Sequence, residues 1–232
     1  MGKLIRFDYA KKGKQDKKMC REQIKLIVNK HTVQKRSKNE YYVADAIQIA
    51  EEILAVYMDK PFGATPIFQV IRDFDFEVCN SDLNNFDEGG ISGIIKVNGN
   101  TKDFYGTDKI IITNMNDPIS HQRFVAAHEL GHYIMDCLGD SKYLDPNILF
   151  EEKYKYNSHQ DKKEKCADQF AAELLMPTKK FVYRYNVASK AYFGNKKKIV
   201  EYLADYFQVK PESIEKRVKE ILLERCAEWF LN

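Results

Sequence analysis

The spacing of apolar positions changes twice along the chain. Residues 17–30 and 40–58 have the three-to-four-residue apolar spacing of amphipathic helices. Between residues 74 and 113, apolar and polar residues alternate instead, as they do in strands with one buried face. The helical spacing returns after residue 117. This order of helices, a small sheet and further helices predicts an α+β fold.

Four stretches in the middle of the chain are expected to form a small, largely antiparallel sheet. They are residues 74–78, 90–97, 101–105 and 109–113. Asn98-Gly99 favours a two-residue hairpin turn between the second and the third stretch.

Proline and glycine mark the ends of the other helices. Thr65-Pro66 and Asp117-Pro118 each have the pattern of an N-cap followed by a first helical residue. Besides 17–30 and 40–58, helices are expected at 66–72, 118–137, 161–175, 196–207 and 211–230. Residues 140–160 show no periodicity and are expected to form a long connection.

The segment HELGH carries the clearest chemistry in the chain. His128 and His132 lie four residues apart on a predicted helix, so their imidazoles share one face about 6 Å apart and can converge on one metal ion. Glu129 is the next residue round the helix, and in such sites it takes a proton from water instead of binding the metal. A glycine at 131 costs about 1 kcal/mol relative to Ala inside a helix, which is easier to explain if something must approach the backbone at Gly131 closely.

A catalytic zinc site of this kind needs a third protein ligand. Glu164 and Asp168 are also four residues apart, on the predicted helix 161–175. One of these carboxylates would bind the ion, and the other would accept a hydrogen bond from the far nitrogen of a ligand histidine. Alanines at 167, 171 and 172 are small enough to let this helix pack against Gly131.

Two motifs together carry a family resemblance. HQRFVAAHELGHYIM (121–135) is followed by the pattern ExxADxFAxxLLMP, which runs from Glu164 to Pro177. The pair resembles the ImmA/IrrE family of zinc metallopeptidases over about residues 40–180. Many relatives have Glu or Gln where this chain has Cys166, which would adjoin the metal helix without binding the ion.

The resemblance implies a zincin-like core and a role for each polar residue of the two motifs. His128, His132 and Glu164 are implied as the ligands of one zinc ion, and manganese in its place stays open. Glu129 is implied as the general base. Asp168 is implied as the carboxylate that hydrogen-bonds a ligand histidine.

Members of this family typically cleave or inactivate helix-turn-helix repressors encoded beside them, on mobile elements, phages or stress operons. The resemblance therefore implies an anti-repressor endopeptidase that regulates transcription, with such a repressor as its substrate or partner. Substrate peptides of zincins generally pair with an edge strand above the metal helix. Residues 90–97 are the candidate for that strand.

Further polar residues near the motifs have less defined roles. A hydroxyl or imidazole usually stabilises the oxyanion, and Tyr133, Tyr183 and His159 all qualify. His121 is expected at the surface or the rim of the site, and Asp136 at the exposed end of its helix.

Two other function classes stay open beside the peptidase. One is a regulatory or toxin–antitoxin-type protein that keeps the metal site but binds its partner without cutting it. The other is a DNA-binding regulator that uses the tail or the basic N-terminus. The tail has the pattern of a helix-turn-helix, although helices with a structural or partner-docking role are the preferred interpretation. Its small core is expected from Ala204, Phe207, Val209, Ile214 and Val218. Lys216, Arg217 and Lys219 would then face phosphates, although the glutamates between them argue against this contact.

Composition sets the outer limits. The chain has 232 residues and a net charge of +3, yet residues 1–38 alone hold thirteen Lys or Arg and three acids. We therefore divide it into a basic N-terminal extension (1–38), a zincin-like metallopeptidase domain (39–180) and a C-terminal helical region (181–232). The five scattered cysteines lack a CxxC pair, and no apolar run or signal-like segment occurs, so we expect a cytoplasmic protein without a disulfide scaffold.

Overall fold

The computed structural model describes residues 5–6, 22–31, 43–57, 63–84, 91–97, 100–137, 150–154 and 162–231. Its strands form one five-stranded sheet in the order β1-β2-β4-β3-β5. The strands are β1 (Ile5–Arg6), β2 (Glu77–Ser81), β3 (Gly93–Val97), β4 (Lys109–Asn114) and β5 (Phe150–Tyr154). Only β2 and β4 pair in parallel, and the other pairs are antiparallel. The α+β class and the largely antiparallel sheet are thus confirmed.

The connection between β3 and β4 differs from the prediction. Residues 101–105 form a short helix, α4 (Thr101–Tyr105), and not a strand. Among the residues of α4 only Thr101 is buried, so this segment does not bury one face against the core as a strand of the sheet does. Asn98-Gly99 lies outside the described residues, but Val97 pairs with Lys109, so the strands are not joined by a two-residue turn.

A second correction concerns the edge of the sheet. Residues 150–154, which lie inside the expected connection, form β5 and pair with β3 from Gly93↔Tyr154 to Val97↔Phe150. Residues 90–97 therefore do not provide an edge strand, because β5 occupies that position. The sequence FEEKY is too short and too polar to show a strand period.

The helices largely follow the predicted spacing. Residues 22–31 are helical, and the later helices are α2 (Val43–Ala55), α3 (Ile67–Asp73), α5 (Ile119–Cys137), α6 (Lys162–Leu175), α7 (Thr178–Ala191), α8 (Lys196–Phe207) and α9 (Pro211–Leu231). The sequence did not predict α7. At α3 the N-cap position is Pro66 without a side-chain hydrogen bond, so Thr65 does not cap this helix.

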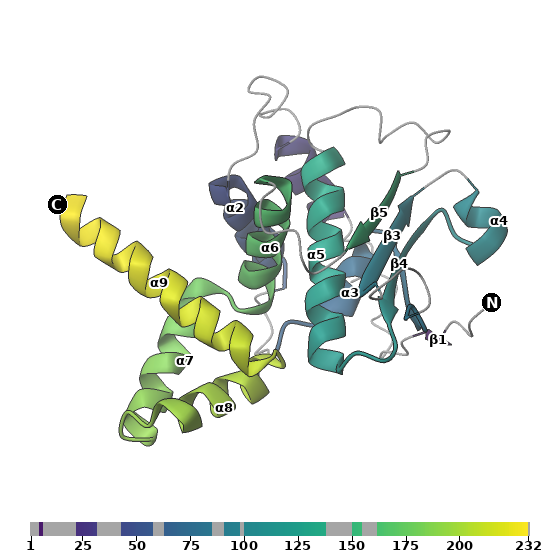
Figure 1. The fold of residues 1–232 in the computed structure, drawn as a ribbon. Coiled ribbons are helices and arrows are strands. Elements are labelled where there is room, and N and C mark those ends of the chain that lie inside the picture. The colour runs from purple at the N-terminus through teal and green to yellow at the C-terminus, as the bar shows by residue number, and fades with distance from the viewer. Residues whose placement is uncertain are drawn as a thin grey trace.

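The centre of the molecule is α5, which lies between the sheet and α6, with α2 on the other side of α6 (Figure 1). One face of the sheet joins the main core under α5 through Phe76, Val78, Ile95, Val97 and Ile111. The opposite face forms a smaller cluster that contains Cys79, Ile94, Ile110 and Ile112. Because α5 contacts other elements on both sides, its side chains are fixed by packing all round.

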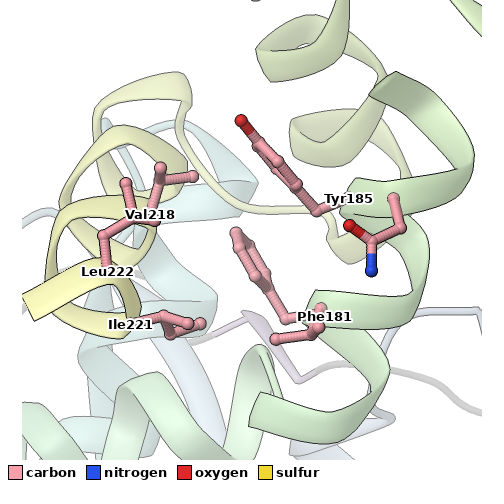
Figure 2. A pocket seen from close by; sticks show the side chains of 7 residues that line it. Phe181, Tyr185, Val218, Ile221 and Leu222 are labelled. Atoms are coloured by element: carbon pink, nitrogen blue, oxygen red, sulfur yellow. The ribbon is translucent and has the colours of Figure 1, made fainter. Parts of the chain in front are cut away.

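The C-terminal helices pack together next to α6 (Figure 1). Four residues of the expected small core are buried, namely Ala204, Phe207, Val209 and Ile214. Between α7 and α9 an apolar pocket remains, lined in part by Phe181, Tyr185, Val218, Ile221 and Leu222 (Figure 2). Within the described parts of the chain, no helix is long and apolar enough to cross a lipid bilayer.

Candidate metal centre

The two histidines of HELGH converge as their spacing predicts. His128 and His132 are almost fully buried on α5, and their Nε2 atoms lie 2.8 Å apart. Their ring centroids are 4.5 Å apart and the rings are inclined by 74°. Two ring nitrogens that each carry a lone pair cannot satisfy one another, so they require a proton or a cation between them.

Glu164 from α6 completes a group of three. Its Oε2 lies 3.2 Å from Nε2 of His128, and its Oε1 lies 3.2 Å from Nε2 of His132. Among the described residues, the donor atoms of these three lie within 4.8 Å of one another. Two ligand atoms of a tetrahedral zinc ion stand about 3.3 Å apart, so this donor set and its spacing fit one zinc ion.

Asp168 lies behind the first histidine, one helical turn beyond Glu164. Its Oδ1 is 3.0 Å from Nδ1 of His128. A proton on Nδ1 donated to this carboxylate leaves the lone pair of Nε2 for an ion. Nζ of Lys216, from α9, lies 3.6 Å from the other oxygen of Asp168. The structure thus brings the Asp168 carboxylate within hydrogen-bond distance of His128, and its role in a metal site remains a prediction.

The pKa values of His128 and Glu164 indicate how this group is protonated when no ion is bound. Burial lowers the pKa of His128, but its hydrogen bonds with Asp168 and Glu164 outweigh burial and raise the pKa to about 9. Burial raises the pKa of Glu164, but hydrogen bonds with His128 and His132 hold it at about 2. In the metal-free protein a proton therefore sits among these groups, and an incoming cation must displace it.

Glu129 is fully buried and is not one of the three donors. It lies against β3, because a Cβ built on Gly93 would be 3.2 Å from Oε1 of Glu129 and 2.3 Å from Cγ1 of Val125. Any side chain at position 93 would therefore clash with α5. This glycine lets the backbone of β3 approach the carboxylate of Glu129.

The close approach that Gly131 predicted is present. A Cβ at this position would be 3.1 Å from Cα of Ala167 and 3.1 Å from a ring carbon of Phe170. The absence of that Cβ brings α5 and α6 together at the level of the donors. The close contact of these two helices holds Glu164 and Asp168 against the histidines.

The other predicted candidates that the structure describes are not among the three donors. His121 is buried beside Asp117, 3.8 Å away, and not at the surface as expected. The hydroxyl of Tyr133 accepts a hydrogen bond from Lys109. Tyr183 is 63% exposed on α7. His159 and the side chain of Asp136 lie outside the described residues, so the choice of an oxyanion-stabilising group stays open.

Two further candidates can be placed. Cys166 is buried at 1% exposure within the main core and is not one of the three donors. The apolar pocket between α7 and α9 has no His, Asp or Glu in its lining, so it is not part of the metal centre.

Sequence reasoning missed a second buried cluster on α6. Arg217 of α9 is 1% exposed and contacts the carboxylate of Glu173, the hydroxyl of Thr178 at 2.8 Å and the carbonyl of Met176 at 3.3 Å. Glu173 also accepts hydrogen bonds from the backbone N–H and the hydroxyl of Thr178. In the DNA-binding alternative Arg217 would face phosphates, and its burial against Glu173 excludes that contact. With Lys216 at Asp168, α9 is docked onto α6 at two points.

Comparison with known proteins agrees with this arrangement. The Peptidase_M78 family model, the IrrE N-terminal-like domain, matches residues 72–219, which is well over half of the chain. The matched range contains α5, α6 and every residue of the candidate metal centre. No curated protein sequence matches the chain significantly.

Proposed function

We propose that this chain, which belongs to the IrrE N-terminal-like family of peptidases, is a zinc-dependent endopeptidase that cleaves a helix-turn-helix repressor. One observation carries the zinc-dependent activity: the donor atoms of His128, His132 and Glu164 converge beside the buried carboxylate of Glu129. A merely structural zinc site would use four protein ligands, whereas three leave a position for a reactant.

Each residue of the site has a separate role in peptide hydrolysis. A bound zinc ion would supply the Lewis acid that polarises the peptide carbonyl and makes hydroxide available near neutral pH. Glu129 takes the proton of the attacking water and returns it to the nitrogen of the leaving amine. Asp168 holds His128 in the tautomer that presents Nε2 to the site.

The choice of a repressor as substrate is supported by the family resemblance. The sheet adds one constraint on how a substrate binds. An extended peptide pairs with an exposed strand edge, and the outer edge of β3 is covered by β5. A substrate that pairs with this side of the sheet would therefore displace β5 or pair with the outer edge of β5.

The test mixes the purified protein with the helix-turn-helix repressor encoded beside its gene. Cleavage fragments should form with zinc and should disappear with a chelator. Glu129→Gln should slow cleavage by roughly 10²–10⁴-fold, the range for loss of a general base, while zinc stoichiometry stays near that of the wild type.

Two outcomes would overturn the proposal in different ways. If the wild type binds zinc and relieves repression but never cuts, the chain is a binding protein. If it cuts an unrelated peptide but not the repressor, the peptidase activity stands and the substrate assignment fails.

A further inference from the structure

The surface formed by α7 and the turn into α8 is strongly basic. Residues 178–200 contain seven Lys or Arg and no Asp or Glu. Five of these cations are exposed, namely Lys179, Lys190, Lys196, Lys197 and Lys198, and Lys197 lies 4.0 Å from Glu201. In Figure 1 the turn between α7 and α8 projects from the molecule, away from the sheet and from α5. A cation-rich surface of this kind attracts polyanions.

An aromatic ring stands in the middle of these cations. Phe193 is 97% exposed, and its backbone is left-handed with φ of 52°. Gly194 follows with φ of 74°, so the turn uses glycine at its second left-handed position but a bulky residue at its first. The left-handed backbone of this bulky residue costs free energy, and its ring is open to a binding partner.

One exposed face of α7 carries two lysines with a tyrosine and an asparagine between them. Lys179, Tyr183, Asn186 and Lys190 follow one another at spacings of four, three and four residues, so they form one stripe about 16 Å long. All four are exposed, and the stripe leads towards Phe193. A helix that lies on a lipid surface has one continuous apolar face, which this stripe lacks. Exposed lysines beside the rings of Tyr183 and Phe193 instead match the phosphates and bases of a nucleic acid strand.

Two further cations of α7 contact neighbouring parts of the chain. The guanidinium of Arg184 lies 4.4 Å from the ring centroid of Tyr206 and 5.6 Å from that of Tyr183. Lys180 donates a hydrogen bond to the carbonyl of Gly63 at 2.8 Å. These two cations attach α7 to its neighbours, while the exposed lysines remain on the outside.

The other basic helix is less suited to a polyanion. On α9, Arg217 is buried against Glu173, and Lys216 is paired with Asp168. Glu212 and Glu215 are exposed on the same helix. The cations that the helix-turn-helix pattern would offer to DNA are thus partly used inside the protein.

We propose that the α7–α8 surface, defined by Lys179, Tyr183, Lys190, Phe193 and Lys196, binds nucleic acid. The lysines contact backbone phosphates, and Phe193 packs on a base or between two bases. This inference does not depend on the peptidase proposal, because none of these residues lies in the metal centre.

The test measures fluorescence anisotropy of a labelled 20-nucleotide single strand and of a 20-base-pair duplex with the full chain. Binding should weaken steeply between 50 and 200 mM salt. Phe193→Gly should weaken binding about tenfold or more, most clearly for the single strand. Glycine suits the left-handed backbone, so this variant removes the ring without harming the fold. The matched control is Phe104→Gly, which removes another exposed phenylalanine, 59% accessible on α4.

The lysines are tested through the salt dependence. The double variant Lys190→Gln, Lys196→Gln should reduce the slope of log K against log salt by about 2. The double variant Lys102→Gln, Lys219→Gln removes the same charge from exposed positions elsewhere and should keep the slope.

Three results would overturn the proposal. The first is no binding of either oligonucleotide at 50 mM salt. The second is equal binding by both double variants, which would place the contact elsewhere. The third is unchanged nucleic acid binding by Phe193→Gly, together with its loss of binding to vesicles of phosphatidylserine and phosphatidylcholine, which would assign the surface to membranes.

Discussion

Helix α6 carries two acid–base clusters. One has the arrangement of a metal site, and the other has the arrangement of a structural contact. Near its start, Glu164 and Asp168 face His128 and His132. At its end, Glu173 faces Arg217. Both clusters join α6 to another helix, and both bury groups that are costly to remove from water.

The two clusters differ in how their atoms are matched. The oxygens of Glu173 receive hydrogen bonds from a guanidinium, a backbone N–H and a hydroxyl, so each acceptor has its own donor. At the other end, two imidazole nitrogens and one carboxylate point at a common centre and need something positive there. A buried ion pair alone does not indicate a functional site. Several nitrogen and oxygen atoms that point at one centre indicate a site for a cation.

The largest effect on zinc binding should follow from removing one of the three side chains of the candidate metal centre. His132→Ala should reduce zinc stoichiometry from near one to near zero, because the remaining two donors cannot close the site. Glu173→Gln should leave the stoichiometry unchanged, since its cluster holds no ion. Metal analysis after gel filtration decides between them. Equal zinc content in the wild type and His132→Ala would show that the ion, if present, is held elsewhere.

The second cluster should respond in stability. Arg217→Met leaves Glu173 buried without its cation and should lower the free energy of unfolding by roughly 3–5 kcal/mol. The double variant Glu173→Gln, Arg217→Met should lose much less, because no uncompensated charge remains. Urea unfolding of the metal-free chains measures both. A loss below about 1 kcal/mol in Arg217→Met would show that this pair is no more than a surface-type ion pair.

An intermediate effect is expected at Asp168, which touches the site without being a predicted ligand. Asp168→Asn should weaken zinc binding about 10–100-fold, because the amide no longer fixes the tautomer of His128 as a carboxylate does. Lys216→Gln should change affinity far less, because the lysine side chain is 60% exposed and screened by water. Competition with a chromophoric chelator gives both constants. Equal effects of the two variants would contradict this ranking.

Local spacing explains how much of the site the sequence could predict. His128 with His132, and Glu164 with Asp168, are pairs of four-residue spacing on segments predicted to be helical, so each pair had to share a face. The missing Cβ of Gly131 also indicated which helix faces meet. The structure brings all these residues together, and their catalytic roles remain predictions.

The remaining features depend on long-range contacts that no local pattern encodes. Arg217 looked like a surface residue because the turn at Pro177, which brings Thr178 to it, is about forty residues away in sequence. The five residues of β5 gain their strand partner from β3, more than fifty residues earlier. Helix α7 mixes basic and aromatic residues on its exposed face, which hides its apolar period.

The smallest expected effect is the pH dependence of the free energy of unfolding of the metal-free protein. The pKa of His128 is raised from 6.5 to about 9, so its contribution to stability is complete below pH 6.5 and is lost as the pH rises through 9. The pKa of Glu164 is lowered from 4.5 to about 2, so its contribution is present above pH 4.5 and is lost as the pH falls through 2.

In His128→Gln, therefore, the free energy of unfolding should fall less than in the wild type between pH 6.5 and 9. Saturating zinc should have a similar effect on the wild type, since the ion replaces the proton among the same atoms. Urea titrations at a series of pH values measure the difference between the two chains. If the free energy of unfolding of the wild type and of His128→Gln changes with pH in parallel across this window, the group of His128, His132 and Glu164 carries no extra proton. Its nitrogen and oxygen atoms would then already be satisfied, like the oxygens of Glu173.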